Sequence, residues 1–344
     1  MSEEERFDAI VVGGGLSGIT AAYVMAEAGL AVLLIEKGTY SGSKNVTGGR
    51  LYTHSLEKII PDFEAKAPLE RKIVNERFSA RADEGFATWE YPSANIHEPE
   101  GSSYSVLRGK FDRWFADCAE DAGVQPVYGV KVDELLVRDG VVAGVVAGDE
   151  EMEANVVVLA DGANSLLAQK LEMKTELNPK LVSVGAKEVL ALAPAVIEER
   201  FALNPGEGLA WIFHGCATDN PAADGFLYTN KDSISVGITL VTESISHSEK
   251  SVPQLLEDFK HHPAIEKLLE GGSLLEYSAH LLPQGGNAMR PKLAGNGVLL
   301  VGDAAALCMD LGYSIRGMDL AIESGRLAAE TIIAATKAKD FSEA

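Results

Sequence analysis

The stretch "IVVGGGLSGI", Ile10–Ile19, decides the fold. It overlaps the apolar run Phe7–Val12, which is short and bounded by glycine and therefore predicts a buried β-strand. Gly13, Gly15 and Gly18 then match the pattern G-x-G-x-x-G. In this pattern the first glycine permits a tight turn, the second lets a pyrophosphate approach the backbone, and the third lets the next helix pack closely on the strand. The stretch therefore predicts a βαβ unit that binds a dinucleotide.

The residues that follow agree with this interpretation. Small residues at apolar spacing predict a helix over 17–28, and a second strand is expected over 31–35. Glu36 stands at the end of that strand, 18 residues after Gly18. A carboxylate in this place binds the ribose hydroxyls of a dinucleotide. The alternative is a βαβ unit without a ligand, in which Glu36 is solvated.

A stretch far along the chain separates NAD from FAD. Val298–Val301 predicts another buried strand, Gly302 and Asp303 follow it, and a long helix is expected from about Gly317. In an open α/β sheet this order places Asp303 and a helix N-terminus beside the glycine-rich loop. Asp303 could bind a ribityl hydroxyl, and the amides of Gly317 and Met318 could stabilise negative charge on a reduced flavin. NAD has neither a ribityl chain nor a ring that is anionic when reduced, so the sequence predicts FAD.

Two other segments are open to two interpretations. The glycine-rich stretch 41–52 predicts a loop, in which Gly48 and Gly49 would let the flavin ring approach closely; a surface loop without a ligand is the alternative. Arg108 opens an amphipathic helix expected over 108–123. It is either a surface cation or a contact to the adenosine or phosphate side of the cofactor.

Arg316 directly precedes the helix expected from Gly317, and it is the one candidate for a catalytic residue. A guanidinium near the flavin N1 and O2 atoms would favour the anionic reduced ring. The alternative is an ion pair with Asp319 or Glu323 on the same helix, and only Asp319, three residues on, is a close neighbour.

The middle of the chain has a different character. Alternating runs predict an antiparallel sheet, with a helix inserted over 252–261. We therefore expect an α/β protein with a Rossmann-like FAD-binding domain, residues 1–170 and 286–344, and a β-rich antiparallel substrate domain, residues 171–285. Four aromatic residues of this second part could line a pocket, but core positions are favoured: Trp211, Phe213, Phe226 and Tyr228.

Charge and composition disfavour several classes of partner. The 344 residues carry a net charge of −21, which repels nucleic acid and anionic lipid surfaces. The three cysteines are far apart and no histidines show the spacing of metal ligands, so no metal site is expected. Neither a signal peptide nor a long apolar run is seen. We expect a cytoplasmic protein, in at most peripheral contact with the inner face of the membrane.

Five segments together resemble the FixC family: "VVGGGLSG", "GSKNVTGGRLY", "YSVLRGKFDRWF", "LADGANS" and "VGDAAALCMDLGYSIRGMDLAI". These flavoproteins are similar to electron-transfer-flavoprotein–quinone oxidoreductases, within the superfamily of geranylgeranyl reductases and aromatic hydroxylases. The resemblance covers essentially the whole chain. It implies FAD contacts from a set of residues that includes the backbone of Val130: Gly13, Gly14, Gly15, Leu16, Ser17, Gly18, Glu36, Lys37, Gly48, Gly49, Arg108, Val130, Gly302, Asp303, Gly317 and Met318.

The resemblance implies that the FAD-binding domain is of the glutathione-reductase type, and it also implies a function. Members of the family pass electrons between the subunits of an electron-transfer flavoprotein, a ferredoxin-like protein and quinone. Family relatives continue with a carboxy-terminal helical segment, in which the quinone oxidoreductases carry their iron–sulfur cysteines, and we expect this segment to be missing here. Two explanations are open: a shortened chain, or an iron–sulfur cluster that a partner supplies. Two other functions stay open: an FAD-dependent reductase or hydroxylase acting directly on a small or prenyl substrate, and a non-catalytic FAD-binding subunit.

Overall fold

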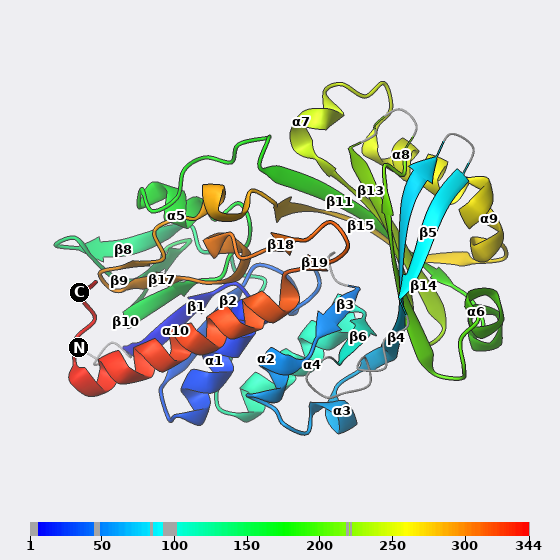
Figure 1. Ribbon diagram of the computed structural model, residues 1–344. Coiled ribbons are helices and arrows are strands. Elements are labelled where there is room, and N and C mark those ends of the chain that lie inside the picture. Colours follow the sequence, from blue (N-terminus) through cyan, green and yellow to red (C-terminus); the bar gives the residue numbers. More distant parts are fainter. Residues whose placement is uncertain are drawn as a thin grey trace.

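Two β-sheets stand side by side, each covered by helices (Figure 1). This arrangement is seen in a computed structural model that describes residues 6–44, 49–82, 85–91, 102–217, 220 and 222–343. The first sheet is formed around the glycine-rich segment. The second sheet carries most of the residues between 171 and 285.

The first sheet has the strand order β16-β17-β10-β1-β2-β7. Strands β1 and β2 are parallel neighbours, and β1, β10 and β17 are also parallel to one another, as expected for a doubly wound sheet. An antiparallel hairpin, β8 and β9, extends β10 on one side. The strands have these bounds: β1 Phe7–Val12, β2 Val32–Glu36, β7 Gln125–Tyr128, β8 Glu134–Arg138, β9 Val141–Ala147, β10 Glu150–Leu159, β16 Ala294–Gly295 and β17 Val298–Leu300.

Helices α1 (Leu16–Glu27) and α10 (Met318–Ala338) lie together on one face of this sheet (Figure 1). Their backbones approach so closely that a Cβ at Gly325 would lie 2.3 Å from the carbonyl oxygen of Ser17. Helix α4 (Arg108–Asp121) packs beside α1. Because side chains alternate along a strand, Val11 faces these helices while Val12 faces the β8–β9 side.

The second sheet has the order β15-β11-β14-β13-β12-β4-β6-β3, with β5 paired to β4. Most of its pairs are antiparallel, but β12 and β4 are parallel. Four of its strands come from residues 50–106, which lie before the range expected to form this sheet. Its bounds are β3 Arg50–Tyr52, β4 Leu69–Ala82, β5 Gly85–Tyr91, β6 Ser103–Val106, β11 Val182–Ala191, β12 Glu207–His214, β13 Ala223–Thr229, β14 Ser233–Val241 and β15 Ser273–Pro283.

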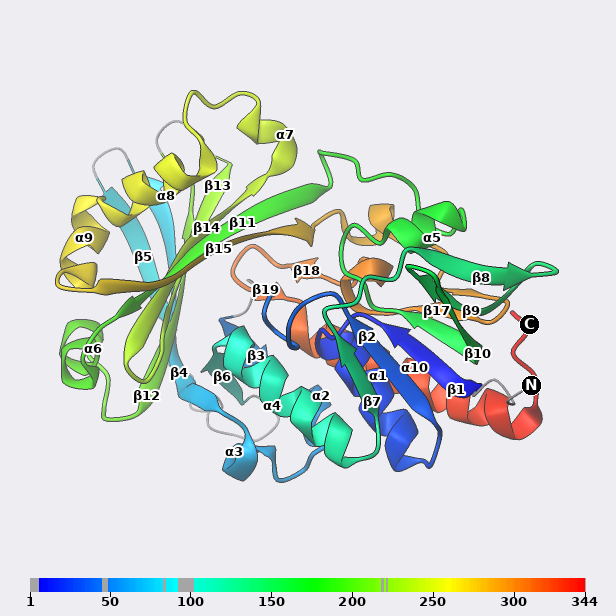
Figure 2. The ribbon, with the colours of Figure 1, turned by 180° about the vertical axis from the view of Figure 1, so that it is seen from behind.

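Helices cover the outer face of the second sheet, and its inner face is turned toward the first sheet (Figure 2). Phe213 and Phe259 belong to the fully buried core on the outer side. The remaining short elements are α2 His54–Glu57, α3 Phe63–Lys66, α5 Leu166–Lys170, α6 Pro194–Phe201, α7 Thr242–Ile245, α8 Val252–Lys260, α9 Pro263–Leu269, β18 Met309–Asp310 and β19 Ile315–Arg316, with 3₁₀ turns at Gly286–Met289 and Gly302–Ala305. Among the described residues, no helix is both long and apolar enough to cross a membrane.

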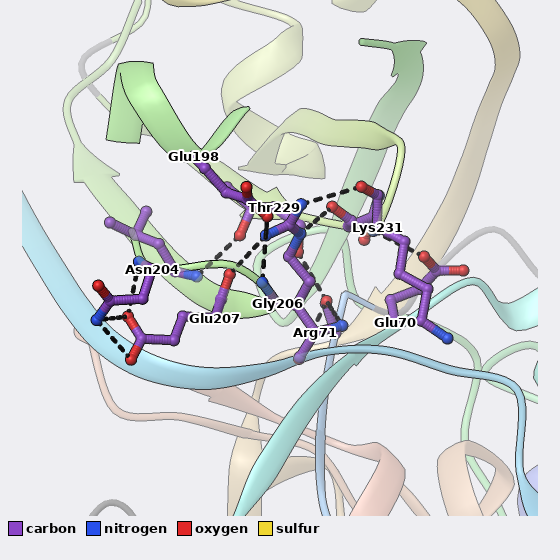
Figure 3. Close-up of polar contacts among 11 residues, drawn as sticks. Glu70, Arg71, Glu198, Asn204, Gly206, Glu207, Thr229 and Lys231 are labelled. Atoms are coloured by element: carbon purple, nitrogen blue, oxygen red, sulfur yellow. Dashed lines mark hydrogen bonds and ion pairs between the residues drawn. The ribbon is translucent and has the colours of Figure 1, made fainter. Parts of the chain in front are cut away.

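A buried arginine ties the early strands to the late ones (Figure 3). Arg71 of β4 is 2% exposed, and its guanidinium donates to the carbonyl oxygen of Asn230 at 2.6 Å and to that of Glu207 at 3.0 Å. It also forms an ion pair of 2.9 Å with Glu198 of α6. A buried guanidinium is stable only when its donors are used in this way. Arg71 therefore joins strands that are more than a hundred residues apart in sequence.

The contact between α1 and α10 yields a stability prediction. Gly325→Ala places a methyl group against a backbone oxygen that cannot rotate away, so α10 must shift. Overpacking of this kind costs about 1–3 kcal/mol. We expect a lower urea midpoint for unfolding of this variant. Thr331→Ala, on the exposed side of the same helix, is the control and should stay within about 0.5 kcal/mol of wild type. Equal stability of both variants would contradict the close contact.

Candidate cofactor site

A cavity of about 450 Å³ lies between the two sheets. One wall is formed by the segments that follow β1, β2, β10 and β17, where the carboxyl ends of the parallel strands meet. The other wall is the inner face of the second sheet, with residues from β11, β13, β14 and β15. The cavity therefore lies where open α/β sheets bind their ligands, and the second sheet closes it.

The glycine-rich loop forms the floor of this cavity, and its glycines are required by close backbone packing. Gly13 has φ +111°, and a Cβ there would lie 2.3 Å from the carbonyl oxygen of Ala160. A Cβ at Gly18 would lie 2.0 Å from the carbonyl oxygen of Gly13. Gly15 is the N-cap of α1, and no side chain caps the helix. The first amides of any α-helix have no intrahelical partner, and such amides can bind a phosphate group.

Glu36 lines the cavity at the end of β2, as predicted. Its carboxylate accepts hydrogen bonds from the amides of Gly14 at 2.7 Å and Gly38 at 2.5 Å. Its backbone carbonyl accepts from the amide of Val130 at 3.2 Å. A carboxylate has about four acceptor positions. Glu36 can therefore brace the loop with two of them and still accept from a ribose.

Asp303 lies across the cavity from this loop, after β17. Burial raises the pKa of its carboxyl group, and the positive charges of Arg108 and Lys174 oppose that rise. Its carboxylate makes no hydrogen bond with any residue that the structure describes. A half-buried carboxyl group without such a partner is costly to the protein alone. Its environment fits a ligand that brings hydroxyl donors, as the ribityl chain of FAD does.

Arg108 is buried, so its interpretation as a surface cation is wrong. Two nitrogens of its guanidinium bind the carboxylate of Asp112, one turn along α4, at 2.6 and 2.7 Å. The pairing follows from the helix itself, because residues four apart lie on the same face. Arg108 also lines the cavity and contributes positive charge there.

Twelve of the sixteen residues expected to bind FAD line the cavity: Gly13, Gly15, Leu16, Ser17, Glu36, Lys37, Gly49, Arg108, Val130, Asp303, Gly317 and Met318. The other described ones stand just behind it. Gly14 binds Glu36, Gly18 packs on Gly13, and a Cβ at Gly302 would lie 2.5 Å from the hydroxyl oxygen of Ser17. Gly48 lies outside the described residues. The contacts of these sixteen residues with FAD stay a prediction.

Gly49 and Arg316 have protein partners. A Cβ at Gly49 would lie 2.1 Å from the ring of Tyr228, so the close approach that requires glycine here involves a tyrosine ring. The guanidinium of Arg316 binds Asp319, with an Nε–Oδ2 distance of 2.9 Å, and lies 4.6 Å from the ring centroid of Tyr52. Its neighbours Ile315 and Gly317 line the cavity, whereas Arg316 is not among the lining residues. The geometry agrees with the ion-pair alternative, and the catalytic role of Arg316 stays untested.

Sequence reasoning missed the wall that the second sheet supplies. Phe226 and Tyr228 line the cavity, but Tyr228 also belongs to a buried cluster against which Phe226 packs, and Phe213 is core as expected. Lys187 and His280 lie on the same wall. A lysine inside the mostly apolar run "LVSVGAKEVLAL", beside Glu188, was the available signal. No group of three or more metal-ligating side chains occurs in the described part of the chain.

The glycine-rich floor, the Glu36 carboxylate and the half-buried Asp303 together fit FAD, so the chemistry of this site is that of an FAD-dependent oxidoreductase. Residues 8–170 match the family model of FAD dependent oxidoreductases. The chain is 52% identical to a probable electron transfer flavoprotein-quinone oxidoreductase, YdiS of Escherichia coli K12, over 98% of this chain and 79% of that protein. It is 50% identical to the protein FixC of Salmonella typhi, over 99% and 79%. The chain therefore belongs to the family of FixC and these oxidoreductases.

Solved structures share the fold. A geranylgeranyl bacteriochlorophyll reductase-like protein of Thermoplasma acidophilum superimposes with a TM-score of 0.80 at 23% identity, over 98% of this chain and 81% of that chain. The myxobacterial chondrochloren halogenase CndH, described as a variant of FAD-dependent halogenases, gives 0.75 at 21% identity, over 98% and 77%. At these identities the comparison shows the fold alone.

Removal of the Glu36 carboxylate should weaken FAD binding. A hydrogen bond to a charged group contributes about 1.5–3 kcal/mol, so Glu36→Ala should lower FAD affinity about tenfold or more. The measurement is the dissociation constant from titration of the apoprotein with FAD. Glu27→Ala, at the exposed end of α1, is the control and should bind normally. Unchanged affinity of the Glu36 variant would show that this carboxylate only braces the loop.

Asp303 should destabilise the apoprotein at neutral pH. Its pKa is raised in the folded state, so stability is lost as the pH rises above the unfolded value of about 3.9. Asp303→Asn removes this penalty. We expect apo-Asp303→Asn to melt at a higher temperature than wild type at pH 7, with a difference that shrinks toward pH 4, and to bind FAD more weakly. A lower melting temperature at pH 7 would contradict the assignment.

Proposed function

We propose that this FAD-dependent electron-transfer oxidoreductase passes electrons between an electron-transfer flavoprotein and quinone, with a ferredoxin-like protein as a further partner. The observation that carries the proposal is the 52% identity, over 98% of the chain, to a protein described as a probable electron transfer flavoprotein-quinone oxidoreductase. Delivery to a membrane quinone would require peripheral contact with the membrane at its inner face.

The cavity is suited to this chemistry. FAD, when bound, supplies a ring that accepts and releases two electrons. Around it, the chain provides charge stabilisation: the N-cap of α10 is Gly317, no side chain caps that helix, and Gly317 and Met318 line the cavity. The positive end of the helix dipole thus points at the site and favours negative charge there.

The two sheets supply different parts of the proposed reaction. The first sheet with α1 and α10 would hold the adenosine, pyrophosphate and ribityl groups of FAD. The inner face of the second sheet would enclose the acceptor, because Phe226 and Tyr228 present aromatic surface to the cavity. The division into an FAD-binding domain, residues 1–170 and 286–344, and a substrate domain, residues 171–285, is part of this proposal.

The test follows the visible absorption of FAD in the purified protein without oxygen. A reduced electron-transfer flavoprotein should bleach the absorption, and 2,3-dimethoxy-5-methyl-1,4-benzoquinone, the head group of ubiquinone, should restore it. NADH or NADPH alone should leave it unchanged. Bleaching by either nicotinamide, with turnover of an added prenyl or aromatic substrate, would indicate a direct reductase or hydroxylase instead. FAD that no donor reduces would indicate a non-catalytic subunit.

A further inference from the structure

A buried lysine stands on the cavity wall formed by the second sheet. Lys187 of β11 is 3% exposed and lines the cavity. Its only described carboxylate neighbour is Glu276 of the edge strand β15, with 3.7 Å between Nζ and Oε1. That distance is too long for a normal hydrogen bond. Glu276 itself is 47% exposed and accepts a hydrogen bond from the hydroxyl group of Ser278.

The other titratable groups near Lys187 do not satisfy it. Arg108 of α4 adds a second positive charge, and burial together with this charge lowers the pKa of the Lys187 ammonium, while Glu276 opposes that change. His280 of β15 lies on the same wall, and its imidazole makes no hydrogen bond with a described residue. A buried ammonium needs hydrogen-bond acceptors. The wall therefore presents a donor that lacks an acceptor of good geometry.

The strand register leaves room for a flat ligand beside this ammonium. Side chains of one strand alternate, so Gly185 and Lys187 share the inner face of the sheet. On the neighbouring strand β14, Gly237 stands opposite Lys187 and is covered by the ring of Phe226, to which a Cβ at Gly237 would approach within 2.3 Å. Gly185 and Thr239 stand opposite each other on β11 and β14 and line the cavity, as does Leu282, whose Cδ1 would lie 3.4 Å from a Cβ at Gly185. A planar ring could lie there, against Phe226.

We propose that Lys187 binds a carbonyl oxygen of the planar quinone acceptor, and that Gly185, Thr239 and Phe226 form the surface on which the quinone ring lies. This inference rests on the proposed function and names the acceptor's binding surface. A neutral quinone offers carbonyl acceptors without adding a charge to the cavity. An ammonium at that oxygen also stabilises the negative charge that builds up there on reduction.

The experiment measures binding to the oxidised, FAD-loaded protein with no electron donor present. The probe is 2,3-dimethoxy-5-methyl-1,4-benzoquinone, and its dissociation constant is read from the shift of the visible FAD spectrum. Lys187→Met keeps the length of the side chain and removes the donor. We expect its dissociation constant to rise about tenfold or more, as for loss of a charge-assisted hydrogen bond. Lys187→Gln, which keeps a weaker neutral donor, should fall between wild type and Lys187→Met.

Lys260→Met is the matched control. Lys260 of α8 binds Glu188, the next residue of β11, at 2.6 Å on the opposite face of the same sheet. This variant should bind the quinone like wild type, and all variants should keep their FAD. The inference would be overturned if Lys187→Met bound the quinone as tightly as wild type does. It would also be overturned if wild type bound benzoate, a planar anion, more tightly than the neutral quinone. Loss of FAD from Lys187→Met would place the lysine in the cofactor site instead.

Failure here is distinguishable from failure of the proposed function. If an electron-transfer flavoprotein reduces the quinone through this protein and Lys187→Met still binds quinone normally, the function holds and the quinone site lies elsewhere. If Lys187→Met loses quinone binding but the flavoprotein does not reduce the bound FAD, the binding surface holds and the proposed donor is wrong.

Discussion

The backbone crossing at the glycine-rich loop is the constraint on which the other elements depend. The carbonyl oxygens of Gly13 and Ala160 leave no room for a Cβ at positions 18 and 13, respectively. These oxygens belong to the backbone and cannot turn aside. The same first turn of α1 then receives two later segments: Gly302 packs on the side chain of Ser17, and Gly325 packs on its carbonyl oxygen. One helical turn thus fixes where β10, β17 and α10 lie.

The net charge of the chain contrasts with the charge of the side chains that line the cavity. The chain carries a net charge of −21, yet Lys37, Arg108 and Lys187 all line the cavity. They come from the first sheet, from α4 and from the second sheet. Positive charge in a partly enclosed site attracts an anionic dinucleotide far more strongly than the same charge in water. The acidic exterior therefore does not oppose binding of FAD at this place.

The features that were predicted correctly are those that a short stretch of sequence determines. The loop Gly13–Gly18, the carboxylate of Glu36 and the position of Asp303 at the end of a strand follow from short patterns, and all of them border or line the cavity. The ion pair of Arg316 with Asp319 was also foreseeable, because helix spacing sets it. These features need no knowledge of distant partners.

Features that depend on strand partners could not be predicted. The strands between 69 and 91 were not predicted, and no local pattern indicates that β4 would lie parallel to β12 in the second sheet. The cavity wall around Phe226 and Lys187 has the same origin, because it exists only once β11, β13 and β14 are in register. Arg108 was ambiguous for a related reason: its burial comes from the segments that close over α4.

The order of strands in the first sheet has a consequence for synthesis on the ribosome. Strand β17 pairs with β10, although about 140 residues, including most of the second sheet, lie between them. At about 5–20 residues per second, the ribosome needs roughly 7–30 s to make that intervening stretch. Throughout this interval the edge of β10 that β17 will pair with is open and Asp303 has not been made. The first sheet is therefore incomplete until late in synthesis, and because the expected FAD contacts Asp303, Gly317 and Met318 are made last, we expect the flavin to be loaded only then.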